Sequence, residues 1–258
     1  FAFVLPLTVA VGNIIAAIIV SLWLLRGTFK SDWNELKHNK VILAVLGFYM
    51  LHIIGLIWTE DMQWGLHILK KETKFLLIPI FMLFVKREHM KYYIYAFLFA
   101  MSLSEILSYG IWFEIIPAFK NATVADPTVF MSHVSYNPFL AIAIYLLSIG
   151  ILFNDNYDKK RKIIYTFFLI TMTINMFITG GRAGQVMFFA LVVILLFQYF
   201  SRYKVKATIL SILIVPTIFF ISYNTSKLFN ERVNSLIFEV QNYDNNANTS
   251  VGLRLLFS

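Results

Sequence analysis

The chain has 258 residues, of which 59% are hydrophobic and 14% are charged, and it contains no cysteine. Soluble domains are roughly 45–50% apolar and about 25% charged, so this composition excludes an ordinary soluble domain and indicates a membrane protein. The lack of cysteine excludes disulfides, thiol nucleophiles and cysteine metal sites, and the net charge of +8 does not indicate nucleic-acid binding, because the basic residues lie between apolar segments.

Eight apolar segments are candidates for membrane-spanning helices, each of which needs roughly 20 apolar residues. In chain order they are 7–25, 41–58, 75–85, 92–113, 134–153, 163–179, 184–200 and 207–223, and 75–85 is short. We therefore predict an all-α fold, a polytopic transmembrane helix bundle over residues 1–223. Residues 224–258 are expected to be the start of a large periplasmic loop. Since the chain lacks an initiator Met and stops where a further helix begins, we expect it to be a fragment.

The loops after alternate spans carry most of the positive charge. Loops 26–40, 86–91, 154–162 and 201–206 hold 14 of the 22 Lys and Arg residues. Cytoplasmic loops carry an excess of Lys and Arg, so these four loops are predicted to face the cytoplasm.

Three segments are predicted to lie on the outer side. The first, 59–74, has apolar residues at helical spacing and predicts an interfacial amphipathic helix that ends in lysines. The second, 114–133, is a loop marked by two prolines. The third begins at Asn224 and contains a helical stripe of apolar residues, followed by a polar stretch; the stripe comprises Phe229, Val233, Leu236 and Val240.

Arg182 lies between two strongly apolar segments, in "ITGGRAGQVMF". An arginine at the centre of a bilayer costs about 2.5–3.5 kcal/mol, and less at the end of a span, where Arg182 is predicted to lie. One interpretation is a snorkelling arginine in a short turn, or one paired with Glu105 or Glu114. The other is an anion site, because Gly180, Gly181 and Gly184 would let the backbone approach a ligand closely. A helix that begins near Ala183 would also point its N–H groups at the anion.

Other residues on the outer side could serve the same site. Arg254, in "SVGLRLLFS", is either an interfacial arginine or a second anion ligand. Lys70, Lys71 and Lys74 either anchor the amphipathic segment at the interface or add positive charge to an anion pocket. His133 lies where the second outer loop enters a span, and is either a polar cap or a catalytic group.

Sequence motifs for several other chemistries are absent. The chain has no H-E-x-x-H, Walker A, dinucleotide or G-x-S-x-G motif. Glu60 and Asp61 form an acidic pair in the first full outer loop, and metal-dependent lipid-linked glycosyltransferases keep such a pair there. A metal-dependent enzyme therefore stays an alternative.

Four stretches of the sequence resemble the O-antigen ligase and polymerase superfamily of bacterial envelope enzymes. "FVLPLTVAVGNIIAAIIVSLWLL" is similar to the opening hairpin of the family, and "MSHVSYNPFLAIAIYLL" to a conserved span entry. "ITGGRAGQVMFFALVVILLF" is similar to the "tgSRga" turn, with Gly181 in place of the usual serine. "TSVGLRLLFS" is similar to the start of the "s.g.Rl" segment in the large outer loop. The family places an essential histidine beyond this last segment, and the chain ends at Ser258 before it.

The resemblance implies transfer of a glycan from undecaprenyl pyrophosphate, at the periplasmic face of the bacterial inner membrane, without a metal or other cofactor. The acceptor would be lipid A–core, a growing glycan or a protein hydroxyl. Arg182 and Arg254 would hold the pyrophosphate, helped by Lys71, Lys74 and Gly181, and His133 is a candidate catalytic residue. The main alternative from another class is a transporter or flippase of an anionic lipid or solute, which would place ionisable groups near the bilayer midplane.

Overall fold

The computed structural model describes residues 1–120 and 122–241, and every regular element in these ranges is a helix. The chain separates into two compact units. The first contains Phe1–Leu5 and Val9–Tyr95, and the second contains Pro6–Thr8 and Ala96–Ser258. Within the described residues, seven helical segments are long and apolar enough to cross a membrane. The chain is therefore a multi-pass membrane protein by the length and composition of its helices.

The first unit begins with α1 (Val9–Arg26), which turns at Gly27 into the short α2 (Phe29–Leu36). Asp32 of α2 is buried and holds this corner together. Its carboxylate accepts hydrogen bonds from the indole of Trp23 at 2.9 Å and the hydroxyl of Thr28 at 3.0 Å. The corner is therefore fixed by a buried, hydrogen-bonded carboxylate.

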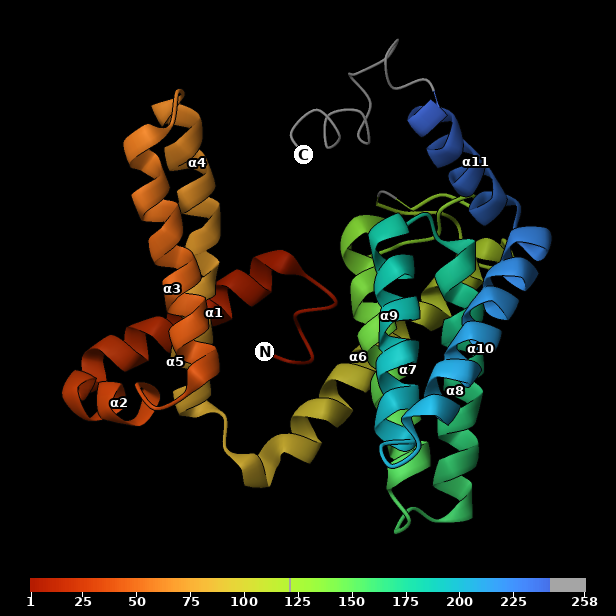
Figure 1. Cartoon of the computed structure of the whole chain (residues 1–258), viewed down its shortest axis with the longest axis horizontal. Helices are drawn as coiled ribbons and strands as arrows, with labels where there is room; N and C mark the ends of the chain where they lie inside the picture. The colour runs from red at the N-terminus through yellow and green to blue at the C-terminus, as the bar shows by residue number, and fades with distance from the viewer. Residues whose placement is uncertain (121, 242–258) are drawn as a thin grey trace. The chain divides into compact units, whose positions relative to one another are not determined.

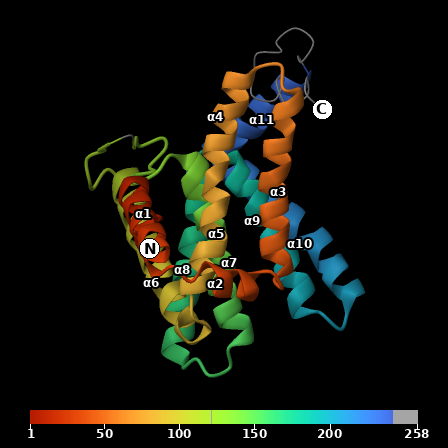
Figure 2. The same ribbon diagram turned by 90° about the vertical axis from the view of Figure 1, so that its left-hand side faces the viewer.

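The next helices of the first unit form an antiparallel pair. The first member is α3 (Lys40–Gly55), which continues as the 3-10 turn η1 (Leu56–Trp58). The second member runs without a break through α4 (Met62–Glu72), the 3-10 segment η2 (Thr73–Leu76) and α5 (Leu77–Phe84). Figures 1 and 2 both show this run beside α3, which contacts all three of its parts.

This helical run differs from the sequence prediction. We expected an interfacial helix over 59–74 and a separate short span over 75–85, but the two segments are continuous. Pro79 explains the 3-10 segment between them, because proline has no N–H to donate to the carbonyl four residues earlier, so the helix tightens ahead of it. The continuous run carries Lys70, Lys71, Glu72 and Lys74 near its middle, so it is not among the seven described helical segments that are long and apolar enough to cross a membrane.

The second unit is built around α7 (His133–Phe153). This helix packs against both α8 (Lys159–Ile178) and α9 (Arg182–Tyr199), and α9 packs against α10 (Lys204–Thr225). The long helix α6 (Met90–Trp112) precedes them, following a 3-10 turn, η3 (Arg87–His89). Most of the buried residues described lie on α6, α7 and α8.

Small residues let α7 occupy the centre of the bundle. Ala141, Ala143, Ser148 and Gly150 are all buried along it, and small side chains allow helices in a membrane to approach closely. Gly150 shows the limit of this spacing, because a Cβ atom there would lie 2.8 Å from the ring of Tyr165 on α8.

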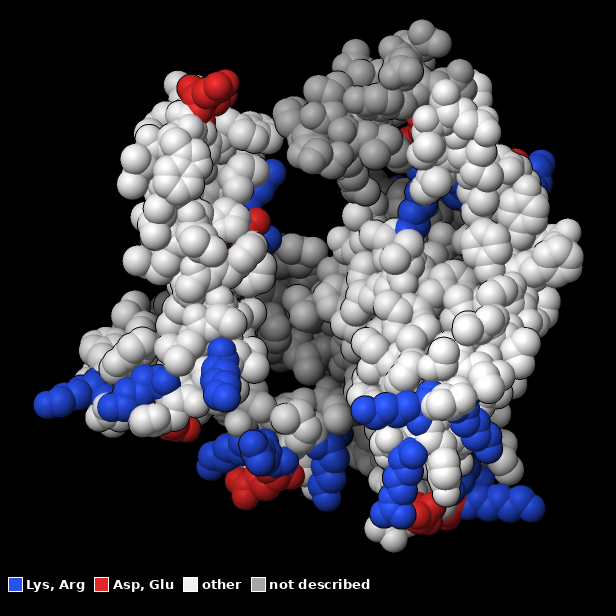
Figure 3. Space-filling view, viewed as in Figure 1, with Lys and Arg blue, Asp and Glu red and all other residues white. Residues whose placement is uncertain are grey.

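The two ends of the second unit differ in charge. The connections α7–α8 and α9–α10 lie at the same end, where Figure 3 shows Lys and Arg gathered. These residues are Lys159, Lys160, Arg161, Lys162, Arg202, Lys204 and Lys206. The helix directions thus agree with the predicted alternation of loops, and we call the opposite end of this unit the outer end.

At the outer end, α10 extends to Thr225 and α11 (Lys227–Gln241) follows after a single residue. The apolar stripe predicted beyond Asn224 is confirmed as a helix. Phe229 is buried, with its ring centroid 5.1 Å from that of Phe177 on α8 and 5.3 Å from that of Phe219 on α10. We predicted a domain boundary after residue 223, and the packing of Phe229 joins the helices on its two sides. The boundary itself stays a prediction.

Candidate anion site at the outer end of the second unit

The α8–α9 turn, Thr179–Gly180–Gly181, is buried and supported by side chains from two helices. The hydroxyl of Thr179 donates to Oδ1 of Asn137 at 2.8 Å, and Nδ2 of Asn137 donates to the carbonyl of Gly181 at 3.4 Å. From α9, Nε2 of Gln185 donates to the carbonyls of Met176 and Thr179 at 3.2 and 3.3 Å. The two bonds from Gln185 satisfy carbonyl groups at the end of α8 that the helix itself leaves unpaired.

Gly181 and Gly184 pack against the first turns of α7. A Cβ atom on Gly181 would meet the carbonyl oxygen of His133 and would lie 2.7 Å from the side chain of Asn137. A Cβ atom on Gly184 would meet Asn137 and would lie 2.6 Å from the backbone nitrogen of Pro138. The sequence suggested that these glycines make room for a ligand, whereas the structure shows that they make room for α7. Binding of a pyrophosphate by Gly181 stays a prediction.

Arg182 is the first residue of α9, one position before the predicted helix start at Ala183. Its Nη1 and Nη2 atoms both lie 3.4 Å from Oε1 of Glu239 on α11. The Arg182 and Glu239 side chains are 28% and 18% exposed. The interpretation that pairs Arg182 with Glu105 or Glu114 is wrong, because α11 folds back over the α8–α9 turn and provides Glu239 instead.

A second guanidinium lies at the same turn. Arg232 of α11 is so close to Gly180 that a Cβ atom there would be 3.1 Å from Nη2 of Arg232. Arg232 is half-buried and forms no ion pair with any residue in 1–120 or 122–241. Arg232 and Glu239 are seven residues apart, or two helical turns, so both project from one face of α11.

Sequence reasoning missed Arg232, because it lies among other charged residues. The available signal was its position next to the apolar stripe of the helix, one residue before Val233. The helix buries Phe229 of this stripe against the bundle, and Arg232, three residues later on the same face, is thereby brought close to the bundle.

His133 and Asp126 form a hydrogen-bonded pair at this turn. The distance from Nδ1 of His133 to Oδ2 of Asp126 is 2.6 Å, and the backbone N–H of Gly180 donates to Oδ1 of Asp126 at 3.4 Å. Because a carboxylate only accepts hydrogen bonds, Nδ1 of His133 carries the hydrogen, and in a neutral ring Nε2 can accept a proton. His133 thus has Asp126 as a partner that the sequence did not indicate, and its catalytic role stays a prediction.

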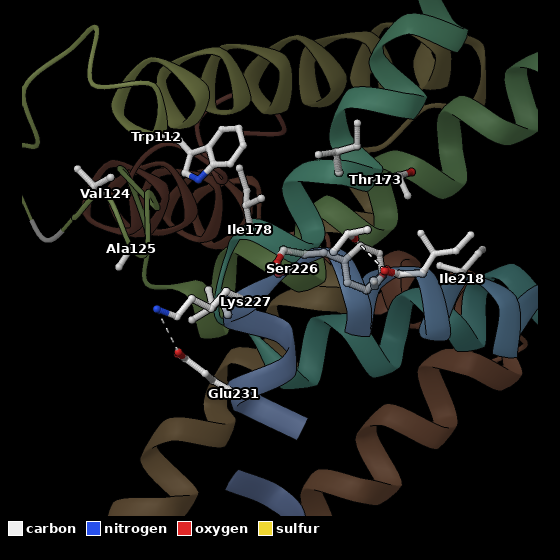
Figure 4. Close-up of a pocket in the computed structure, with 15 residues that line it drawn as sticks. Trp112, Val124, Ala125, Thr173, Ile178, Ile218, Ser226, Lys227 and Glu231 are labelled. Atoms are coloured by element: carbon white, nitrogen blue, oxygen red, sulfur yellow. Dashed lines mark hydrogen bonds and ion pairs between the residues drawn. The ribbon is translucent and has the colours of Figure 1, made fainter. Parts of the chain in front are cut away.

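A groove of about 750 Å³ opens beside the turn, between α8 and α10 (Figure 4). Its walls are mostly apolar and include Ile174 and Ile178 of α8 and Ile218 and Ile221 of α10. Lys227 and Glu231 of α11 stand at its rim, with 4.0 Å between the ammonium and the carboxylate. The groove combines a hydrocarbon surface with a charged edge.

The remaining predicted site residues lie outside the described part of the second unit. Lys71 and Lys74 belong to the first unit, and Lys71 lies 5.9 Å from the ring centre of Trp64. Arg254 lies outside the described residues. The prediction that Arg182 and Arg254 bind a pyrophosphate together therefore stays a prediction. Arg182 and Arg232, by contrast, lie at the same turn.

The acidic pair of the metal-dependent alternative lies at the start of α4. The carboxylate of Asp61 accepts a hydrogen bond from the backbone N–H of Trp64 at 2.9 Å and so caps this helix. Glu60 precedes it in the connection from η1. Helix capping gives Asp61 a structural role that needs no metal.

Comparison of the chain with models of protein families, with curated proteins and with solved structures finds no match.

Proposed function

We propose that this chain is a membrane glycosyltransferase, similar to O-antigen ligases. It would move a glycan from undecaprenyl pyrophosphate to an acceptor hydroxyl at the periplasmic face of the bacterial inner membrane. The observation that supports this proposal is the convergence of Arg182, Arg232 and the Asp126–His133 pair on one buried turn.

The two arginines suit a diphosphate leaving group. Departure of a diphosphate needs stabilisation of negative charge, and guanidinium groups bind phosphate oxygens through paired N–H donors. In the structure, the carboxylate of Glu239 takes the position on Arg182 that a phosphate oxygen would take. Only one oxygen of Glu239 is used, since its Oε2 atom is buried without a hydrogen-bond partner among the described residues. This incomplete pairing supports displacement of Glu239 by a diphosphate.

The acceptor side of the reaction needs a proton acceptor. Nε2 of His133 would take the proton from the acceptor hydroxyl as its oxygen attacks the anomeric carbon, and the bond from that carbon to the diphosphate would break. Asp126 would act as a positioning residue, because it fixes the imidazole through Nδ1. The acceptor is a lipid A–core, a growing glycan or a protein hydroxyl.

The groove between α8 and α10 suits the hydrocarbon chain of the donor. Its apolar walls lie on two membrane-spanning helices, and its charged edge lies at the outer end. A polyprenyl chain in this groove would keep its diphosphate at the level of α11.

Replacing either arginine by alanine should lower glycan transfer by about 100-fold, the usual effect of removing one charge-stabilising donor. The variants are Arg182→Ala and Arg232→Ala in the full-length protein. The measurement is transfer of a labelled glycan from undecaprenyl pyrophosphate to the acceptor. Arg202→Ala, at the opposite end of the unit, should transfer at the wild-type rate.

A double variant separates loss of folding from loss of transfer. Arg182→Ala alone leaves Glu239 without its partner, whereas Arg182→Ala with Glu239→Gln removes the whole ion pair. If the double variant is as thermally stable as the wild type and still transfers glycan normally, Arg182 has no part in the reaction.

A transporter of an anionic lipid or solute is the second candidate, and one observation favours it. Glu105 is only 2% exposed and lies within the membrane-spanning part of α6, and ionisable groups in such positions often line transport pathways. Flux of a lipid-linked glycan across vesicles, with no change to the glycan, would support transport over transfer. The metal-dependent alternative at Glu60 and Asp61 is tested by a chelator, which should leave the proposed reaction unaffected.

A further inference from the structure

The core of the second unit contains a cluster of oxygen atoms without hydrogen-bond partners. Four buried side-chain atoms in the described residues lack a partner, and three of them are Oε1 and Oε2 of Glu105 and Oγ of Ser104. Glu105 is 2% exposed and Ser104 is 1% exposed. Glu105 lies seven residues before the end of α6, or about 10 Å along the helix from its outer end. The cluster is therefore separate from the arginines at the α8–α9 turn.

The groups around this cluster are also oxygen-rich. Ser108 is one helical turn from Glu105 on the same face of α6 and accepts a hydrogen bond from Nδ2 of Asn175 at 2.9 Å. The phenol of Tyr136 approaches both Ser104 and Glu105, and it donates to Oδ1 of Asn175 at 3.0 Å. The hydroxyls of Ser108 and Tyr136 thus border the cluster.

The neighbouring donors are already engaged. The hydroxyl of Tyr136 donates its hydrogen bond to Asn175. The hydroxyl of Tyr109, which lies near Glu105, donates its hydrogen bond to the carbonyl of Thr171 at 2.7 Å. The hydroxyl of Thr171 faces Glu105 but donates to the carbonyls of its own helix at 3.0 and 3.3 Å. No Lys, Arg or His among the described residues forms an ion pair with Glu105.

A carboxylate in this position needs a compensating positive charge, because burying an unpaired ion in a medium of low polarity is very unfavourable. A proton would neutralise Glu105 but would not provide a donor for its second oxygen. A single cation beside this turn of α6 would serve as the partner of these oxygens. One negative charge is balanced by one positive charge, so a divalent ion would leave an excess charge in the core. Carboxylate and hydroxyl oxygens are hard ligands, which favour a small hard cation.

We propose that Glu105, Ser104 and the adjoining hydroxyls of Ser108 and Tyr136 form a binding site for a monovalent cation, with Na⁺ as its ligand, in the core of the second unit. The bound ion would join α6 to α7, since Tyr136 belongs to α7. The site is independent of the proposed glycosyl transfer, and its binding can be measured without any substrate.

The test is the thermal unfolding of the full-length protein in detergent, in sodium chloride and in choline chloride of equal ionic strength. A ligand that binds only the folded state raises its stability with the logarithm of ligand concentration. The unfolding midpoint of the wild type should therefore rise by about 3–5 °C for each tenfold increase in sodium once the site is filled. Choline is too large to enter and should have no such effect.

Two variants and a control make the result specific. Glu105→Gln keeps the shape of the side chain without its charge and should abolish the response to sodium, and Ser104→Ala should weaken it. Ser148→Ala is the matched control, because Ser148 is a buried serine of α7 whose hydroxyl donates to the carbonyl of Ile144 at 2.8 Å. It should respond to sodium as the wild type does.

Three outcomes would overturn the proposal. The first is equal unfolding midpoints of the wild type in sodium and choline. The second is a sodium response that persists in Glu105→Gln. The third is a midpoint that changes with pH through Glu105 but not with sodium, which would show that a proton occupies the site instead.

Discussion

At the scale of single residues, the sequence reveals a charge most clearly where its neighbours are apolar. Arg182 could be identified because it interrupts two spans, and it does lie at a buried turn. Arg232 and Asp126 lie in polar segments, where a charged residue is unremarkable, whereas Glu239 has apolar neighbours and was still missed. Their contacts with the turn depend on how α11 and the outer loop fold back, which the local sequence does not specify.

The glycines near Arg182 show a related limit. Their presence was predictable as a sign of close approach, but the approaching group could not be identified from sequence. For Gly181 and Gly184 that group is the start of α7, from the carbonyl of His133 to Asn137 and the backbone of Pro138. Glycine permits contact with a ligand or with another helix equally well.

The packing role of Gly184 predicts a large effect of one methyl group. Gly184→Ala should destabilise the protein by about 1–3 kcal/mol, because the new Cβ would lie 2.6 Å from the nitrogen of Pro138 and backbone atoms cannot rotate away. The measurement is the thermal unfolding midpoint in detergent. Gly47→Ala, in the middle of α3 with nothing within 4 Å of its Cβ, is the control and should not lower the midpoint. Equal midpoints for the two variants would contradict close packing at Gly184.

At the scale of helices, seven of the eight predicted spans coincide with described helices that are long and apolar enough to cross a membrane, and one region differs. The charged residues Lys70, Lys71, Glu72 and Lys74 interrupt the apolar pattern, so 59–74 and 75–85 were separated. The backbone nevertheless stays helical through them, because no glycine or proline intervenes between α4 and the first turn of α5. Hydropathy reports the environment of a segment, whereas helix continuity depends on backbone hydrogen bonds.

The attachment of α11 depends on one aromatic residue. Phe229→Ala should release α11 from α8 and α10, because it removes a buried ring that contacts Phe177 and Phe219. Truncation of a buried phenylalanine typically costs about 3–5 kcal/mol. Limited proteolysis should therefore cut the variant within α11 much faster than the wild type. Leu236→Ala on the same helix, where Leu236 is 42% exposed, should be cut at the wild-type rate.

At the scale of the whole molecule, strict alternation of spans correctly predicted which connections share an end of the second unit. This alternation of connections follows from the lengths of the helices and the charges of the connections. The division into two units was not predicted, because each span satisfies the same composition rule whichever helices it contacts.

The absence of cysteine from the sequence makes this topology directly testable. Single substitutions Asn156→Cys and Ser201→Cys lie in the α7–α8 and α9–α10 connections, and Ala125→Cys lies in the outer loop. A maleimide that cannot cross membranes should label Ala125→Cys in intact spheroplasts, and the other two only after the membrane is opened. Labelling of all three from one side would contradict the assigned helix directions.

The side-chain bonds that close the α8–α9 turn have a consequence for movement. From within the bundle, Asn137 donates to the carbonyl of Gly181 and Gln185 donates to the carbonyl of Thr179, and these bonds hold the shape of the turn. Arg182 directly follows this hydrogen-bonded turn, whereas Arg232 belongs to the peripheral α11. A bulky ligand that enters between the two guanidinium groups would therefore displace only α11. Amide protons of α11 should exchange with deuterium well before those of the α8–α9 turn.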